Sequence, residues 1–312
     1  MIKRWIILWL VCIGLTACST SNSETKFQEK DVAKSKSVIE KVIERNISPA
    51  PVTPFKMAKE PKNFLLIGID SRGERSSRSD AIMLARYEPA EKKLKLVSLM
   101  RDSYVKIPNH SMTFSKLNHA YYLGGKDLLK RTVEENFGVK VDHIAIIDFK
   151  GFINVMDTIA PNGLDVEVTQ AMIDDMKLSA MPGKQKLHGE DLLSYVRFRH
   201  DNMSDFGRVN RQQEILISLK NQVIDEFSSI DGIAKFPEII KQTLQNVETD
   251  LNFDEAFSMG ASFLLNPVND IQTLRVPVSN SFENKHYQHA GSVLQLDLNE
   301  NEEAIKQFLR KN

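Results

Sequence analysis

Apolar and polar residues follow one another along this chain in a pattern that predicts strands first and helices later. Residues 63–70 form a nearly continuous apolar run, which is typical of a buried strand. Two more strands are expected at 81–87 and 94–100, with a turn at 88–91 between them. Because short turns join antiparallel neighbours, the folded part of the chain should open with three consecutive strands.

Helical spacing becomes frequent after residue 100. Helices are expected at 116–136 with an interruption at Gly124–Gly125, at 151–159, at 189–199 and at 208–227, and strands at 141–149 and 164–168. Residues 228–312 should add two or three helices, with short strands near 271–278 and 293–298, and complete the same domain. This order predicts an α/β fold, a central mixed β-sheet with helices on both faces.

The first 17 residues have the pattern of an export signal. Lys3 and Arg4 precede an apolar run of thirteen residues, which is shorter than the roughly 20 that a membrane-spanning helix needs. The segment that ends at Cys18 resembles a bacterial lipobox, which implies cleavage before Cys18 and a lipid anchor on it; an uncleaved signal anchor is the alternative. Residues 18–61 are polar and contain spaced prolines, so we interpret them as an extended stalk, or in the first half as a disordered tail.

Charge and motif content exclude several classes of function. Lys+Arg and Asp+Glu both number 41, so no basic excess favours nucleic acid as a partner. The chain lacks a G-x-S-x-G elbow, an H-E-x-x-H motif, a Walker loop and a G-x-G-x-x-G motif. Serine-nucleophile chemistry, zinc hydrolysis and a nucleotide cofactor are therefore unsupported.

Aspartates and arginines gather where the predicted strands end. If the first three strands are antiparallel neighbours, Asp70, Asp80 and Arg101 fall at the same edge of the sheet. Two carboxylates there repel unless a divalent cation or an arginine (Arg72, Arg78 or Arg101) lies between them. This edge is a candidate pyrophosphate site, and a solvated loop with surface salt bridges is the alternative.

The helix expected from Arg208 adds to the charged edge. Arg208 and Arg211 in its first turn would oppose the helix dipole, and a bound anion would remove that conflict. Gln212 lies on the same face as both arginines. Neutralisation by Asp201 and Asp205 is the alternative.

In a series of ordered blocks, the chain closely resembles the LytR-CpsA-Psr family over residues 63–226, and we place the catalytic domain at 62–227. The blocks are Phe64–Arg72, Arg78–Asp80, Ser98–Asp102, Lys116–Tyr121, Val141–His143, Asp148–Phe149, Tyr195–Arg199, Asp205–Arg208 and Arg211–Gln213. Two departures are Met100, where the family often has proline, and Pro161–Asn162, where it often has two glycines.

The resemblance implies an extracytoplasmic phosphotransferase of Gram-positive-type envelopes. Such an enzyme moves an anionic glycopolymer, a teichoic acid or capsule-like polysaccharide, from undecaprenyl pyrophosphate to the C6 hydroxyl of muramic acid in peptidoglycan. It would act at the outer face of the cytoplasmic membrane. A polyprenyl pyrophosphate phosphatase and a non-catalytic lipoprotein that binds the carrier lipid remain alternatives.

The resemblance also implies roles for individual residues. Asp70 and Asp80 would hold Mg²⁺ or Mn²⁺ and, with Arg101 and Arg208, form the catalytic group. The residues expected to bind the pyrophosphate are Arg72, Arg78, Lys116, Arg197, Arg199, Arg211 and Gln212. The polyprenyl chain would lie in an apolar tunnel between sheet and helices; Phe149, Phe152, Val155, Met156 and Ile215 are candidates to line it, although their spacing fits ordinary core positions equally well.

Overall fold

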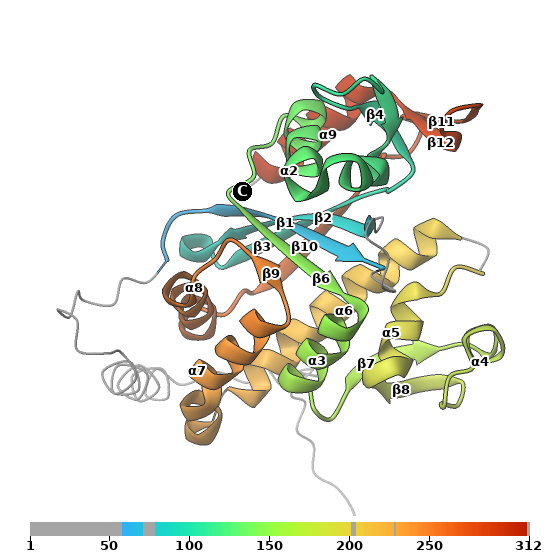
Figure 1. The fold of residues 1–312 in the computed structure, drawn as a ribbon. Coiled ribbons are helices and arrows are strands. Elements are labelled where there is room, and N and C mark those ends of the chain that lie inside the picture. Colours follow the sequence, from blue (N-terminus) through green and yellow to red (C-terminus); the bar gives the residue numbers. More distant parts are fainter. Residues whose placement is uncertain (1–57, 71–78, 201–203, 228, 311–312) are drawn as a thin grey trace, which may run out of the picture.

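The structure is a computed structural model that describes residues 58–70, 79–200, 204–227 and 229–310 (Figure 1). The export signal, nearly all of the predicted stalk, Cys18, Arg72 and Arg78 lie outside these residues. Within the described part, no helix combines the length and apolar character that a bilayer crossing requires.

A six-stranded mixed sheet in the order β10-β3-β2-β1-β6-β9 forms the centre of the molecule. Its strands are β1 (Lys62–Ile69), β2 (Ser79–Glu88), β3 (Lys93–Leu99), β6 (His143–Asp148), β9 (Glu248–Thr249) and β10 (Asp270–Val276). β1, β2 and β3 pair antiparallel in succession, whereas β6 and β10 run parallel to β1 and β3. The predicted hairpin order of the first three strands is confirmed.

Two smaller sheets flank the central one. The first has the order β11-β12-β4-β5 and the second pairs β7 with β8. Their strands are β4 (Ser103–Lys106), β5 (Phe114–Lys116), β7 (Leu164–Val168), β8 (Gly183–Leu187), β11 (Phe282–Tyr287) and β12 (Gly291–Leu296). Of these, only β7 and β12 correspond to strands that the sequence pattern predicts.

Helices cover both faces of the central sheet, as predicted (Figure 1). On one face lie α2 (Leu117–Phe137) and α9 (Leu298–Arg310) together with the β4 sheet. On the other lie α3 (Phe149–Ile159), α5 (Gly189–Arg197) and α6 (Asp205–Glu226). The remaining helical elements are η1 (Pro89–Glu91), α4 (Gln170–Met176), α7 (Ile230–Gln245) and α8 (Phe253–Leu265). The predicted interruption of α2 is also confirmed, because Gly124 and Gly125 have non-helical backbone angles.

Successive side chains of β1 point to opposite faces of the central sheet. Leu65 and Ile67 are at most 1% exposed and pack in the core beneath α2. Leu66 and Gly68 alternate with them and line a cavity on the other face, where neither is fully buried. One strand therefore stabilises the core on one side and shapes a cavity on the other.

Asn136 joins α2 to the edge of β4. Its side chain donates to the carbonyl of Lys106 at 2.8 Å and accepts from the Lys106 amide at 3.0 Å, while also donating to the Thr132 carbonyl at 2.7 Å. Asn136 itself is 7% exposed, and its side chain satisfies backbone groups of both elements.

We expect Asn136→Ala to lower the free energy of unfolding by about 2 kcal/mol, because it leaves the Lys106 amide and carbonyl without partners. In a body of this size that corresponds to a fall of about 4–8 °C in Tm, measured by circular dichroism. Gln170→Ala is the control, because in the described part of the chain the Gln170 side chain bonds to Asp174 on an exposed helix surface. Equal Tm values for the two variants would contradict this account.

Candidate active site

A β-bulge places Asp80 at the edge where β1 ends. Gly68 pairs with Ala81 and Ile69 pairs with Ser79, so Asp80 is an extra residue in β2. Bulges redirect one side chain and are frequent beside active sites. Asp70 follows Ile69 directly, so the register brings both carboxylate-bearing residues to one edge, as the sequence predicts.

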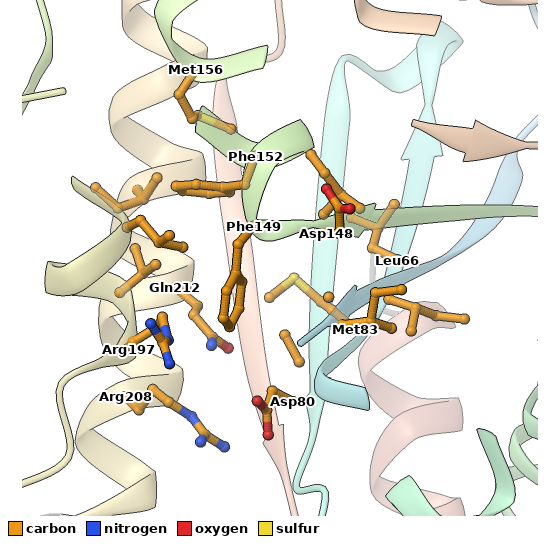
Figure 2. A pocket seen from close by; sticks show the side chains of 18 of the residues that line it. Leu66, Asp80, Met83, Asp148, Phe149, Phe152, Met156, Arg197, Arg208 and Gln212 are labelled. Atoms are coloured by element: carbon orange, nitrogen blue, oxygen red, sulfur yellow. The ribbon is translucent and has the colours of Figure 1, made fainter. Parts of the chain in front are cut away.

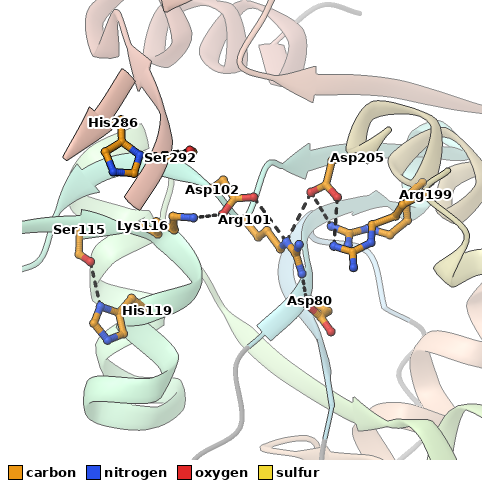
Figure 3. A network of polar contacts seen from close by, with 11 residues as sticks. Asp80, Arg101, Asp102, Ser115, Lys116, His119, Arg199, Asp205, His286 and Ser292 are labelled. Carbon is orange, nitrogen blue, oxygen red and sulfur yellow. Dashed lines mark hydrogen bonds and ion pairs between the residues drawn. The ribbon is translucent and has the colours of Figure 1, made fainter. Parts of the chain in front are cut away.

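Arg101, which follows β3, lies between three carboxylates (Figure 3). Its Nη1 donates to Oδ1 of Asp80, and its Nε lies 3.4 Å from Oδ2 of Asp205 and 3.6 Å from Oδ2 of Asp102. Burial alone would lower the pKa of Arg101, but these three carboxylates outweigh it and raise the pKa. The guanidinium is therefore fixed in place and remains charged.

The start of α6 differs from the expected one. The helix begins at Asp205, so Asp205 occupies its first turn, which is the favourable end for an acidic residue. The prediction that Arg208 and Arg211 stand in the first turn against the dipole is wrong for this reason. Asp205 instead accepts from Arg208 at 2.9 Å and lies 3.7 Å from Arg199.

Arg208 is the most confined cation of the site, with 4% of the residue exposed. Its pKa is lowered to about 10, mainly by burial and also by the neighbouring Arg101, while Asp205 opposes the shift. Within the described residues its Nε has no hydrogen-bond partner. A buried donor without an acceptor is costly, so this guanidinium is suited to an anion that the protein itself does not supply.

These contacts join seven charged residues, which we call the ion-pair cluster. Its members are Asp80, Arg101, Asp102, Lys116, Arg199, Asp205 and Arg208. Four cations stand against three carboxylates, which leaves one positive charge in excess. The cluster joins the ends of β2, β3 and β5 to the start of α6, positions that are far apart in the chain.

An apolar cavity of about 530 Å³ opens beside the ion-pair cluster (Figure 2). Leu66 and Met83 from the sheet face Phe149, Phe152 and Met156 from α3 across it. Asp80, Arg197, Arg208 and Gln212 lie together at one end of the cavity, as Figure 2 shows. The site is thus an apolar cavity with a charged mouth.

The predicted pyrophosphate residues do not all line this cavity. Arg199 and Gln212 line the cavity, and so does Arg197, whose guanidinium lies 4.1 Å above the Phe149 ring. Lys116 pairs with Asp102 at 2.8 Å and does not line this cavity. The five tunnel candidates, Phe149, Phe152, Val155, Met156 and Ile215, all line it.

Arg211 is placed elsewhere. It is 6% exposed, it donates to the carbonyl of Phe198 and its guanidinium lies 5.1 Å from the Phe198 ring. It is not among the residues that line the apolar cavity. Its charge therefore holds the end of α5 against α6.

A second, polar cavity of about 240 Å³ meets the first at Asp80 and Arg101. Asp102, Lys116, His119 and His289 are among its other lining residues, and none of these four lines the apolar cavity. Sequence reasoning missed this cavity and did not assign Asp102 a role, although Asp102 directly follows Arg101. It named Asp205 only as a neutralising alternative.

The carboxylates fit a magnesium ion that shares its ligands with a substrate. No group of three or more acidic, histidine or cysteine side chains that could enclose a metal occurs among the described residues. Asp70 and Asp80 supply two hard oxygen donors at one edge, and Mg²⁺ is commonly bound by one or two carboxylates together with substrate phosphates. The donor set suits that shared arrangement.

Comparison with known proteins establishes the family. The LytR_cpsA_psr family profile matches residues 15–306. The regulatory protein MsrR of Staphylococcus aureus (strain COL) is 36% identical over 247 residues, 79% of this chain and 74% of MsrR. The chain belongs to the LytR_cpsA_psr family, which confirms the resemblance.

The relatives of this chain include transferases of cell-wall polymers. TagV of Bacillus subtilis (strain 168), a polyisoprenyl-teichoic acid–peptidoglycan teichoic acid transferase, is 33% identical over 214 residues, 65% of this chain and 53% of TagV. The B. subtilis TagV structure has a TM-score of 0.66 at 27% identity and covers 82% of this chain and 100% of that one. The structure of TagT bound to LIIa-WTA has a TM-score of 0.66 at 26% identity and covers 85% of this chain and 96% of that one. These structures confirm the fold class.

We expect Arg208→Gln to raise the free energy of unfolding of the ligand-free protein. Burial in the folded protein lowers the Arg208 pKa to about 10, well below its ordinary value, so at neutral pH the charged form opposes folding. At about 1.4 kcal/mol per pH unit the net cost, which already includes the attraction of Asp205, is about 3 kcal/mol. Because the Gln amide is itself a buried polar group, the variant should gain only about 1–2 kcal/mol of this. Urea unfolding at pH 7 measures this gain in the free energy of unfolding.

The matched control is Arg131→Gln, which removes an exposed arginine from α2 and should leave stability unchanged. A lower unfolding free energy for Arg208→Gln than for this control would show that Arg208 stabilises the fold.

Proposed function

We propose that this protein transfers an anionic glycopolymer from a polyprenyl pyrophosphate carrier to peptidoglycan at the outer face of the cytoplasmic membrane. The observation that carries the proposal is the position of two cations, the buried Arg208 and the partly buried Arg101, at the mouth of an apolar cavity. A ligand that joins a diphosphate to a hydrocarbon chain matches both parts of this site. Undecaprenyl pyrophosphate is such a ligand.

The donor would lie with its isoprenoid chain among Phe149, Phe152 and Met156, and its diphosphate among Arg208, Arg199 and Gln212. The names of two relatives support the same substrate class. TagV is named for a polyisoprenyl-linked teichoic acid and peptidoglycan, and TagT was solved bound to LIIa-WTA. We take a teichoic acid or a capsule-like polysaccharide as the polymer and the muramic acid C6 hydroxyl as the acceptor.

In the proposed reaction the acceptor oxygen forms a bond to the phosphorus atom that carries the glycan. The bond from this phosphorus to the bridging oxygen breaks, and the carrier lipid leaves as its monophosphate with that electron pair. The hydroxyl proton passes to a carboxylate at this edge, Asp80 or Asp102. Arg101 and Arg208 hold the phosphate oxygens and stabilise the charge that develops on them.

Charge balance supports a divalent cation in this site. A diphosphate that links a lipid to a glycan carries two negative charges, and the ion-pair cluster has an excess of one positive charge. Asp70 and Asp80 would hold Mg²⁺ or Mn²⁺, which when bound would polarise the phosphate oxygens. A lipid on Cys18, or an uncleaved signal anchor, would keep the site near its carrier at the membrane.

We expect Arg101→Gln to lower the transfer rate by about 10³-fold or more, in line with arginines that stabilise phosphoryl-transfer transition states. The assay offers the full chain in detergent micelles a synthetic lipid-pyrophosphate disaccharide and peptidoglycan, and measures glycan attached to the acceptor. Arg131→Gln is the control and should keep full activity.

The same assay separates the alternatives. Release of phosphate without attached glycan would identify a phosphatase, in which water replaces the acceptor hydroxyl. Binding of the lipid by a wild-type protein that catalyses neither reaction would identify a carrier-lipid-binding lipoprotein.

The shared metal site makes a distinct prediction. Mg²⁺ alone should barely change the Tm of the protein, whereas Mg²⁺ with farnesyl pyrophosphate should raise Tm more than either added singly, because the diphosphate supplies the missing ligands. Differential scanning fluorimetry measures the Tm shifts. Asp80→Asn should abolish the additional Tm rise that Mg²⁺ and farnesyl pyrophosphate produce together. A large shift with Mg²⁺ alone would contradict the shared site.

A further inference from the structure

Four ring-bearing side chains form a surface next to the polar cavity, and we call it the aromatic shelf. It consists of Tyr104 on β4, Phe114 on β5, Tyr287 on β11 and His289 in the turn before β12. The Tyr104 ring lies 4.6 Å from the Tyr287 ring and 5.7 Å from the Phe114 ring, centroid to centroid, and stacks with both. The Tyr104 hydroxyl lies 3.1 Å from Nε2 of His289.

The shelf is accessible and continuous with the reaction site. Phe114 is 39% exposed. His289 is exposed and belongs both to the shelf and to the lining of the polar cavity. That cavity in turn reaches Asp80 and Arg101. A ligand on the shelf would therefore extend towards the groups that hold the diphosphate.

The two cavities approach this point from opposite faces of the central sheet. The apolar cavity lies between the sheet and the layer of α3, α5 and α6, whereas the polar cavity lies on the side of α2 and the β4 sheet (Figure 1). Their linings meet at Asp80 and Arg101. In-line phosphoryl transfer places the attacking and leaving oxygens on opposite sides of the phosphorus. If the leaving lipid phosphate comes from the apolar cavity, the attacking hydroxyl must come from the polar one.

We propose that the polar cavity and the aromatic shelf bind the acceptor, a glycan strand of N-acetylated amino sugars. This inference rests on the proposed function and deepens it, because it assigns the acceptor its own surface. Aromatic rings pack against the C–H faces of sugar rings, and hydroxyl and imidazole groups bond to sugar hydroxyls and amides. Lys116 and His119 line the cavity through which the reacting hydroxyl would reach the phosphorus.

The test uses the full chain in detergent micelles and a variant that carries both Phe114→Ala and Tyr287→Ala. The acceptor is a peptide-free tetrasaccharide of alternating N-acetylglucosamine and N-acetylmuramic acid, and the donor is a lipid-pyrophosphate disaccharide. We expect the variant to raise the apparent KM for the tetrasaccharide by about ten-fold or more while the KM for the donor stays unchanged. Phe253→Ala on α8, which removes an equally exposed phenylalanine from outside both cavities, should change neither constant.

An unchanged KM for the acceptor in the double variant would overturn the inference. A rise in the KM for the donor alone would also overturn it, because the aromatic shelf would then bind the sugars of the donor. Binding of the tetrasaccharide without donor, followed by titration calorimetry, provides an independent measurement. Wild-type protein that binds the tetrasaccharide but catalyses no transfer would contradict the proposed function. The glycan-binding surface would still be supported if the double variant bound the tetrasaccharide about ten-fold more weakly. Equal binding by wild type and variant would remove the glycan surface itself.

Discussion

The placement of Arg101 among Asp80, Asp102 and Asp205 is the interaction on which the rest of the site depends. These carboxylates come from a bulge in β2, from the connection between β3 and β4 and from the first turn of α6. Without a cation between them these carboxylates would repel one another. The same guanidinium lies where the linings of the apolar and polar cavities meet. One side chain thus neutralises the carboxylates at this edge and lines both cavities of the proposed reaction site.

Arg208 shows why such a site favours an anion over the empty state. Its guanidinium is buried, its charged form opposes folding at neutral pH, and one of its donors has no partner among the described residues. A protein that keeps such a group accepts a loss of stability for a function. Because β2, β3 and α6 are rigid elements, the cations are in place before any ligand arrives, and little reorganisation is needed when charge develops on a phosphate.

Part of this arrangement could be predicted from the sequence. The apolar run of residues 63–70, the turn at 88–91 and the alternation of residues 94–100 are strong local signals, and antiparallel pairing converts them into the meeting of Asp80 with Arg101. The polar cavity could not be predicted in this way. β5 has three residues and β11 reads Phe-Glu-Asn-Lys-His-Tyr, so neither carries the apolar alternation that marks a strand. Arg211 has the spacing that places it beside Arg208, yet the carbonyl at the end of α5, which needs a donor, competes for it. Asp205 directly after Ser204 is a helix-start signal that places the beginning of α6 three residues before Arg208.

The central claim is that cations from separate elements hold one diphosphate at the mouth of an apolar cavity. Its most direct test is mass spectrometry of the lipid that co-purifies with the full chain from a Gram-positive host. The account predicts a polyprenyl lipid that bears a diphosphate, retained by the wild type and absent from Arg208→Gln. Recovery only of lipids without a diphosphate, or of the same diphosphate lipid in equal amount from both proteins, would contradict it.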